Sequence, residues 1–253
     1  MKLWYDKPAE KWEEALPLGN GFLGAMVYGT IDTEHIQVNE DSLWSGGAIE
    51  RENPDCKKYL SQVKDLLKEG RHVEAERLAQ FAMAGTPRSQ RAYQTLGDIY
   101  LHFWNKEHTV KDYRRYLDLD LAETKVEYSA SAAGETCTYQ REIFISYPAR
   151  VMVMRLTSSC SGKLNFHVLL DRRKNLDHVW SEDNKRIAID GCNGNPGIGF
   201  CAMLQAESKD GNVSVIGEHL IVENASEAIL YFTASTTFRV FYSEHTLVDK
   251  HRF

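Results

Sequence analysis

The stretch ALPLGNGFLGAMVYGTIDTEHIQVNEDSLWSGG, from Ala15 to Gly47, decides the fold of this chain. Two apolar runs in it, GFLGAMVYGTI and EHIQVN, are bounded by glycine and polar residues, a pattern that predicts a β-hairpin. The second run leads directly into Asn39, Glu40 and Asp41, and Trp44 follows closely. Two adjacent carboxylates in an apolar hairpin serve either chemistry or a structural purpose.

Short apolar runs also fill most of the remaining chain. KLNFHVLLD, RIAIDG, GFCAMLQAE, VSVIGEHLIVEN and AILYFTAST follow one another at spacings of roughly ten residues, separated by Gly, Asn, Asp and Ser. Further upstream, Leu117, Leu119 and Leu121 are expected on one face of a long strand. Asp118 and Asp120 are then expected on the opposite face. The predicted fold is mainly β, with antiparallel sheets packed as a β-supersandwich.

One segment departs from the period of two. From Pro54 to Met83, apolar residues recur at helical spacing in two stripes, and Gly70 between them can end the first helix in a left-handed conformation. This pattern predicts a helical hairpin, about residues 54–83, inserted between early strands. Its lysines and glutamates are expected to form a solvated face.

The composition indicates a soluble globular protein, since 43% of the 253 residues are hydrophobic and 26% are charged. A net charge of −6 argues against a surface for nucleic acid or an anionic membrane. Five cysteines without CxxC spacing are expected to be free thiols, not a zinc site or a disulfide framework. Free thiols and a charged N-terminus without a secretory signal predict a cytoplasmic location, unless a signal has been removed by processing.

The residue types suggest few reaction centres. Glu40 and Asp41 point to opposite faces of an extended strand, so they cannot flank one scissile bond, which needs facing carboxyls about 5 to 9 Å apart. Two alternatives stay open: they hold the strand end as hydrogen-bond acceptors beneath Trp44, or they belong to a sugar site. Gly19 and Gly21 are expected in a tight turn that needs positive φ, and no helix follows them to hold a nucleotide phosphate.

The histidines and aromatic residues allow weaker inferences. None of the nine histidines has metal-ligand spacing, so no metal is expected, and His102 and His167 are expected in the core or on a sheet face. No GxSxG motif indicates a serine hydrolase. Exposed tryptophans beside Asn and Asp loops would suit carbohydrate, whereas buried ones would be ordinary core residues.

Several long strings resemble glycoside hydrolase family 95, whose members are chiefly α-L-fucosidases, some of them acting on L-galactose residues. The resemblance begins with WEEALPLGNGFLGAMVYGTIDTEHIQVNEDSLWSGG (Trp12 to Gly47) and includes the helical insertion and YQTLGDIYLHF (Tyr93 to Phe103). It continues through YRRYLDLDLAETKVEY and YQREIFISYPARVMVMRL and covers the chain to about Phe238. It implies an N-terminal β-supersandwich domain over residues 1–240, and the start of a linker or divergent tail at 241–253.

The family resemblance also implies where the chemistry lies. In that family, the acid carboxylate and the asparagine-activated water of an inverting mechanism lie in a following (α/α)6 barrel. That barrel is absent here, so no catalytic residue is assigned and no cofactor is expected. The implied partners are the missing helical barrel domain and, for the full-length enzyme, fucosylated oligosaccharide, with neither nucleic acid nor membrane. Candidates for contact with substrate or barrel are Asn20, Asn39, Glu40, Asp41, Trp44, Gln94 and Asp98.

Three functions are compatible with these observations. The chain is the non-catalytic front domain of an α-L-fucosidase-type enzyme, or a stand-alone carbohydrate-binding β-sandwich module, or a structural domain whose exposed face needs a partner. Hydrolysis of an aryl fucoside by the chain alone would contradict the first function as stated. Binding of a fucosylated oligosaccharide would favour the second, and self-association through an apolar patch would favour the third.

Overall fold

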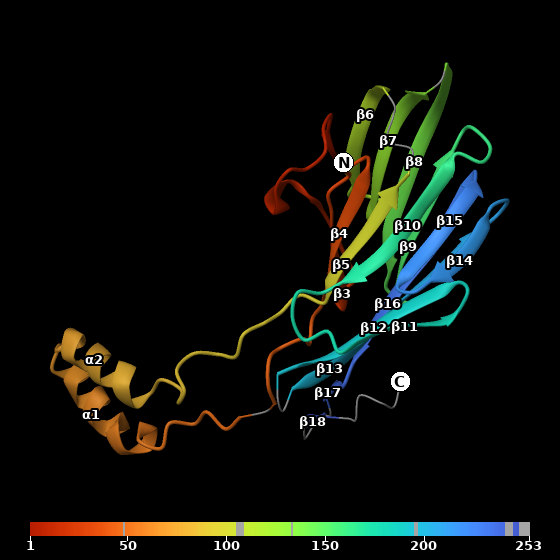
Figure 1. Ribbon diagram of the computed structural model, residues 1–253. Helices are drawn as coiled ribbons and strands as arrows, with labels where there is room; N and C mark the ends of the chain where they lie inside the picture. The colour runs from red at the N-terminus through yellow and green to blue at the C-terminus, as the bar shows by residue number, and fades with distance from the viewer. Residues whose placement is uncertain (48, 105–108, 133, 195–196, 241–244, 248–253) are drawn as a thin grey trace.

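The quoted stretch forms three consecutive strands, beginning with β2, in a computed structural model of the protein (Figure 1). β3 (Leu23–Val27) and β4 (Thr33–Glu40) make the expected hairpin, and every second side chain of each is buried. A period of two places one face of a strand against the core and leaves the other toward solvent. The structure describes residues 1–47, 49–104, 109–132, 134–194, 197–240 and 245–247.

Neighbouring strands pair antiparallel in two large sheets. The nine-stranded sheet has the order β1 (Lys2–Tyr5), β6 (Thr109–Asp118), β7 (Glu123–Ala132), β8 (Glu135–Ser146), β9 (Val151–Ser158), β16 (Glu227–Thr236), β13 (Ile198–Ser208), β12 (Arg186–Asn193), β11 (His178–Asp183). The seven-stranded sheet has the order β14 (Asn212–Ile216), β15 (His219–Ala225), β10 (Leu164–Asp171), β5 (Gly97–Phe103), β4, β3, β2 (Leu16–Gly19). A 3-10 helix covers Trp12–Glu14.

The inner faces of the two sheets share one hydrophobic core. Phe166 of the seven-stranded sheet belongs to the same buried cluster as Phe200 and Phe232 of the nine-stranded sheet. Each such side chain contributes about 1.5–3 kcal/mol when it is removed from water. The expected mainly β sandwich of antiparallel sheets is therefore confirmed.

The inserted helical hairpin is also confirmed, as α1 (Cys56–Lys68) and α2 (His72–Ala82). Gly70 between the helices has a φ of +74°, the left-handed conformation that ends a helix without a side-chain clash. The hairpin projects away from the sandwich (Figure 1). Its own core is small and is formed by Val63, Leu66 and Ala75.

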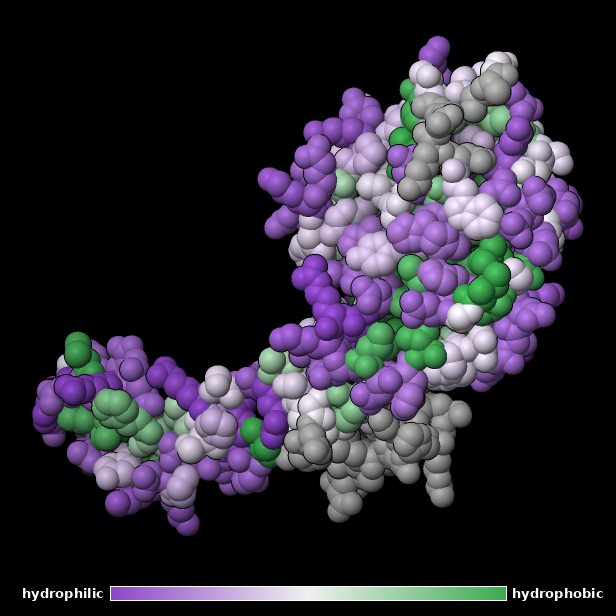
Figure 2. Space-filling model, in the orientation of Figure 1, coloured by the Kyte–Doolittle hydropathy of each residue, from purple (hydrophilic) through white to green (hydrophobic). Residues whose placement is uncertain are grey.

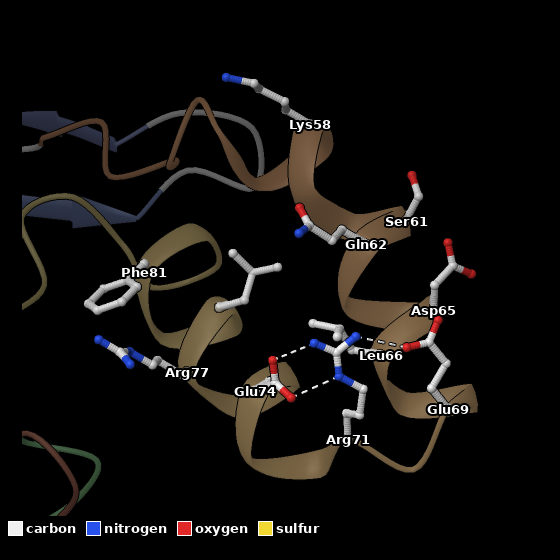
Figure 3. A pocket seen from close by; sticks show the side chains of 11 residues that line it. Lys58, Ser61, Gln62, Asp65, Leu66, Glu69, Arg71, Glu74, Arg77 and Phe81 are labelled. Carbon is white, nitrogen blue, oxygen red and sulfur yellow. Dashed lines mark hydrogen bonds and ion pairs between the residues drawn. The ribbon is translucent and has the colours of Figure 1, made fainter.

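A shallow groove of about 690 Å³ is lined by residues of both helices (Figure 3). In it, the guanidinium of Arg71 bridges the carboxylates of Glu69 and Glu74 at nitrogen–oxygen distances of 3.0 and 2.5 Å. The lysines and glutamates of the hairpin are exposed, as expected for a solvated face. Within the described residues, neither helix is long and apolar enough to cross a membrane.

The alternation expected from Leu117 to Leu121 is wrong beyond Asp118, because β6 ends there and the chain turns back into β7. Leu119 and Leu121 are 47% and 66% exposed, whereas Asp118 is buried. The Asp118 carboxylate accepts the N–H of Asp120 at 3.1 Å. A short acidic side chain that bonds the backbone two residues on favours a turn over a continued strand.

Of the two glycines expected in a tight turn, one lies in a turn and the other in a strand. Gly21 has a φ of +89° and occupies the expected tight turn. The same expectation for Gly19 is wrong, because Gly19 lies in β2 and pairs with Gly24. Pro148 lies in the turn between β8 and β9, where its missing N–H costs no hydrogen bond of the sheet.

The end of the chain is described only in part. Residues 241–244 and 248–253, most of the expected linker or tail at 241–253, lie outside the described residues. β18 (His245–Leu247) pairs with β17 (Phe238–Val240). The domain boundary near residue 240 and the missing barrel stay predictions.

A buried ion pair connects the two sheets. Nη1 of Arg141 on β8 lies 2.6 Å from Oε2 of Glu34 on β4, and both side chains are buried. Glu34 also accepts the N–H of Gly29, while Arg141 donates to the carbonyl groups of Thr30 and Ile31. Each charge has several hydrogen-bond partners, and these partners offset the free-energy cost of burying it. A lone buried charge without them would be very unfavourable.

We expect Arg141→Met to lower the free energy of unfolding by about 3–5 kcal/mol, since it leaves the Glu34 carboxylate buried without its cation. Urea unfolding followed by circular dichroism measures the change. Arg155→Met is the matched control, because Arg155 pairs with carboxylates where its side chain is 46% exposed. Its loss is expected to cost less than about 1 kcal/mol. Equal destabilisation of the two variants would contradict the role of the buried pair.

Cys137 and Cys160 form a disulfide, with their Cα atoms 5.6 Å apart. The expectation of free thiols is therefore wrong for this pair, although Cys56, Cys192 and Cys201 are free. The antiparallel pairing of β8 with β9 brings the two half-cystines together from distant sequence positions. The thiol argument for a cytoplasmic location no longer holds, and that location stays a prediction.

Replacing both half-cystines, as in Cys137→Ala with Cys160→Ala, is expected to lower the free energy of unfolding by about 3 kcal/mol. The physical reason is that the disulfide restricts the unfolded chain over a sequence separation of 23 residues. Urea unfolding with and without a thiol reductant measures the loss. Cys192→Ser, which removes a free thiol, should stay sensitive to the reductant. An unchanged unfolding midpoint in the double variant would refute the prediction.

Candidate binding site

The residues expected to touch substrate or a neighbouring domain fall into two groups. Those near one end of the seven-stranded sheet, on β4, on β5 and on the adjoining segments, are Asn39, Glu40, Asp41, Trp44, Gln94 and Asp98. Asn20 lies apart, where its Oδ1 accepts the N–H groups of Phe22 and Leu23 at 3.0 and 2.8 Å. Its Nδ2 donates to the carbonyl of Ser146. Asn20 therefore stabilises its own turn.

Glu40 and Asp41 lie on opposite sides of the chain, as their adjacency predicts. Asp41 is exposed, whereas Glu40 is buried and its Oε2 accepts both the N–H and the hydroxyl of Ser42, at 2.9 and 2.7 Å. The Ser42 hydroxyl is also 2.6 Å from that of Thr236. Burial raises the pKa of the Glu40 carboxyl above its usual range. Glu40 thus holds the strand end from inside the sandwich.

Tyr93 links the end of β4 to Trp44. Its hydroxyl lies 2.6 Å from both Oδ1 of Asn39 and the carbonyl oxygen of Glu40. The rings of Trp44 and Tyr93 meet edge to face with centroids 5.1 Å apart, and Trp44 stays 38% exposed. Trp44 therefore packs on Tyr93, and Tyr93 bonds the strand end. Tyr93 was not among the residues selected from the sequence.

We expect Tyr93→Phe to lower the free energy of unfolding by about 1 kcal/mol, because the variant loses the hydroxyl that bonds Asn39 and the end of β4. Thermal and urea unfolding both measure the loss. Tyr147→Phe is the matched control, since Tyr147 is 65% exposed. If Tyr93→Phe is no less stable than Tyr147→Phe, the hydroxyl does not hold this end of the sheet.

A chain of polar side chains continues from Gln94 into the sandwich. Nδ2 of Asn175 lies 3.1 Å from Oε1 of Gln94 and 3.1 Å from Oδ1 of Asn193. Asn193 is fully buried and donates to the carbonyl of Leu43 at 2.9 Å. Arg172 donates to Gln94 at 3.3 Å. Sequence reasoning missed these three partners of Gln94 and Leu43, because asparagine near a turn is common and its partner is set by tertiary contact.

A hollow of about 400 Å³ lies beside this network on the outer face of the seven-stranded sheet. We call it the Tyr28–Tyr100 hollow, and its lining residues are Tyr28, His35, Gln37, Gln94, Thr95, Gly97, Asp98, Tyr100, Arg172, Arg173 and Lys174. The predicted residues Gln94 and Asp98 therefore share one site. The seven-stranded sheet is in front in Figure 1, and in the same orientation Figure 2 shows hydrophilic surface over much of the sandwich.

Three stacked rings form one wall of the hollow. The ring of His35 lies between those of Tyr28 and Tyr100, with centroid distances of 4.3 and 4.7 Å. Nε2 of His35 lies 2.6 Å from Oδ1 of Asp98. Burial, followed by the nearby Asp98 carboxylate, raises the pKa of both tyrosine hydroxyls above their usual value. Both hydroxyls are therefore neutral donors and acceptors at neutral pH.

A close approach of two backbones positions Asp98 in the hollow and Asp171 beside it. A Cβ on Gly97 would lie 2.5 Å from the carbonyl oxygen of Asp171, so the sheet has room only for glycine there. The same register places Asp98 opposite Asp171. Asp98 bonds His35, and Oδ1 of Asp171 accepts the N–H of Arg172 at 2.7 Å. Each carboxylate thus already has an internal partner.

Outside the hollow, His102 and His167 extend the row of rings across the outer face. Their rings stack with centroids 4.8 Å apart. Thr33 Oγ1 lies 3.2 Å from Nδ1 of His102, and Trp104 Nε1 donates to Nδ1 of His167 at 3.0 Å. The expectation that both histidines lie in the core or on a sheet face is confirmed.

The described carboxyls with raised pKa do not reach the hollow. Burial raises the pKa of Glu34 as well as that of Glu40, but Glu34 faces Arg141 between the sheets and Glu40 faces Ser42. A general acid must lie within hydrogen-bond reach of the atom that it protonates. Neither carboxyl is placed for that task in the described part of the chain.

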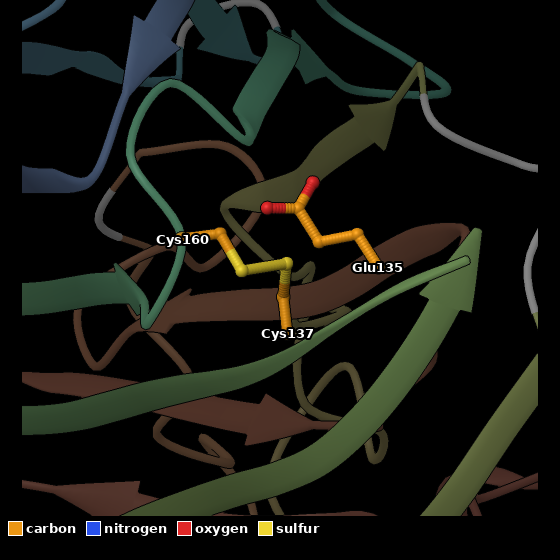
Figure 4. A group of neighbouring side chains, drawn as sticks. All are labelled: Glu135, Cys137 and Cys160. Carbon is orange, nitrogen blue, oxygen red and sulfur yellow. A yellow bond between two sulfur atoms is a disulfide. The ribbon is translucent and has the colours of Figure 1, made fainter. Parts of the chain in front are cut away.

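A glutamate lies beside the disulfide, on the nine-stranded sheet. A carboxylate oxygen of Glu135 and the sulfur atoms of Cys137 and Cys160 lie within 4.8 Å of one another (Figure 4). Thiolate sulfur is the form that binds zinc, and both sulfurs here are joined to each other. Glu135 pairs with Lys163 at 2.8 Å. In this oxidised form the group is a structural cross-link, and the expectation of no metal stays a prediction.

Residues 3–240 match the family described as Glycosyl hydrolase family 65, N-terminal domain. The chain is 32% identical to alpha-L-fucosidase 2 of Arabidopsis thaliana, over 94% of this chain and 30% of that protein. It is 35% identical to "Probable alpha-fucosidase A" of Aspergillus niger, over 63% of this chain and 20% of that protein. The Aspergillus oryzae protein of the same name is 29% identical over 63% of this chain and 22% of its own length. The chain thus spans less than a third of each of these relatives.

Proposed function

This chain belongs to the family of glycosyl hydrolase family 65 N-terminal domains, and from this premise we propose that it is the non-catalytic front domain of an α-L-fucosidase-type glycoside hydrolase. The observation that carries the proposal is the 32% identity to alpha-L-fucosidase 2 across 94% of this chain and within 30% of that protein. A domain of that relative size leaves most of such an enzyme to supply the reactive groups.

The chemistry of inverting hydrolysis supports a division of labour. One carboxylic acid protonates the leaving oxygen and a base activates water, with the two groups about 6.5–9.5 Å apart. Glu34 and Glu40 are buried, and Asp98 is bonded to His35. We therefore assign hydrolysis of terminal fucosyl or L-galactosyl linkages to a helical barrel outside this chain. Its substrate would be a fucosylated oligosaccharide, and no cofactor would be needed.

The end of the sandwich around Trp44 is the surface that we assign to contact with that barrel. Asp41 is exposed and Trp44 is 38% exposed, while Glu40, Asn39 and Tyr93 hold the strand end beneath them. A rigid support of this kind presents exposed side chains in one geometry. Asn20 lies apart and is left with its role in the turn.

A domain exchange tests this function. This chain is put in place of the aligned region of alpha-L-fucosidase 2 from Arabidopsis thaliana. We expect the chimera to hydrolyse 4-nitrophenyl α-L-fucoside, because the reactive groups remain and the front domain restores their support. The same enzyme without any front domain is the negative control. The isolated 253-residue chain is expected to release no nitrophenol.

Two outcomes oppose the proposal. Turnover of the aryl fucoside by the isolated chain would place the reactive groups within these 253 residues. A soluble, folded chimera without fucosidase activity would show that this domain does not serve such an enzyme. Asp41→Ala with Trp44→Ala in the active chimera then tests the contact surface, where unchanged stability and turnover would remove it from the proposal.

A further inference from the structure

We propose that the Tyr28–Tyr100 hollow is a binding site for a neutral, hydroxyl-rich saccharide, and that this chain binds such a ligand without any other domain. The site lies on the outer face of the seven-stranded sheet and is lined by other side chains than the surface around Trp44. Gln94 links the two, because its N–H donates to the carbonyl of Leu43, next to Trp44. The inference goes beyond the role of a front domain, because it holds whether or not the chain serves a fucosidase.

The shape of the hollow suits a small ligand. Its volume of about 400 Å³ lies within the range of about 300–1,000 Å³ that ligand pockets occupy. Its walls come from β4, from β5 and from the segments after β3, before β5 and after β10, and Gly97 lets β5 approach the end of β10 closely. Convergence of separate segments fixes the polar groups before a ligand arrives, which lowers the entropy lost on binding.

The polar groups match the hydroxyl groups of a sugar. A hydroxyl both donates and accepts, so a sugar needs donors and acceptors in alternation. The hydroxyls of Tyr28 and Tyr100 and the amide of Gln37 can do both, the Asp98 carboxylate accepts, and Arg173 donates. Every group of this set can form a hydrogen bond with a sugar hydroxyl.

The orientation of the rings decides between a sugar and an apolar ligand. The planes of Tyr28 and His35 differ by 26°, and those of His35 and Tyr100 by 15°, so His35 is covered on both faces. A stacked row presents ring edges with their hydroxyl and nitrogen atoms, whereas an apolar or aromatic ligand needs open ring faces. Recognition in the hollow therefore proceeds through hydrogen bonds.

The hollow has charges of both signs, and a neutral ligand can accept from the cations and donate to the carboxylate at once. Arg173 and Lys174 are exposed cations on the rim, and the Asp98 carboxylate belongs to the lining. Asp171 is outside the lining but lies opposite Asp98 on the same face. Arg172 is buried and already donates to the carbonyl of Thr95 at 3.3 Å and to Gln94. A free phosphate or uronate would meet the Asp98 carboxylate as well as the cations.

Titration calorimetry on the complete chain tests the site, with 2′-fucosyllactose and lactose as neutral probes and galacturonate and inorganic phosphate as anionic ones. We expect saturable binding of a neutral probe at one site. Tyr100→Phe and Gln37→Ala should each weaken that binding roughly 3- to 10-fold, since each removes a hydrogen-bonding group. Tyr116→Phe, on the outer face of the nine-stranded sheet, is the matched control and should leave binding unchanged.

Three results would overturn the inference. A folded chain that binds neither neutral probe has no such site, and binding of phosphate or galacturonate alone would make the hollow an anion site. Neutral binding that neither Tyr100→Phe nor Gln37→Ala weakens would place the ligand elsewhere. Circular dichroism melting of each variant verifies that it is folded. A chimera that hydrolyses aryl fucoside while the isolated chain binds no sugar would reject this inference and leave the proposed function intact.

Discussion

Glu34 carries its carboxylate into the space between the two sheets, where Arg141 and the N–H of Gly29 are its partners. Arg141 in turn donates to two carbonyl groups of the turn that precedes β4. A slip of one residue would move every side chain of a strand to the opposite face. The ion pair thus fixes Glu34 inward, and with it His35 and Gln37 outward, so the outer hollow depends on a contact between the sheets.

The sequence predicted those parts of the fold in which one pattern repeats over many residues. Alternating burial along β4 and β5 and the two helical stripes beside Gly70 are such patterns, and the sandwich and the helical hairpin followed from them. Local reasoning failed where a single side chain outweighed the pattern. Asp118 ends a strand by bonding the backbone of the turn, and the period of two cannot reveal this. The Cys137–Cys160 bond needed the pairing of β8 with β9 to become visible.

The candidate site was predictable only in part, for a related reason. Gln94 and Asp98 were selected through the family resemblance, and both line the hollow. Tyr28, His35 and Tyr100 were not selected, because none stands out in the sequence. The β4–β5 register brings His35 to Tyr100, and the turn after β3 brings Tyr28 to His35. A binding surface made by several strands has no continuous signature in the chain, so it emerges once the pairing is known.

The helical hairpin leaves and rejoins the sandwich at one place, where Ser45 bonds Ala92 and Trp44 pairs with Tyr93. Farther out, Arg51 donates to the carbonyl groups of Pro87 and Arg88 and holds the two connecting segments side by side. Because its base is closed in this way, the strand ends stay together regardless of what the hairpin does farther out. A change in the length of the hairpin would therefore leave the pairing of the sheets in place.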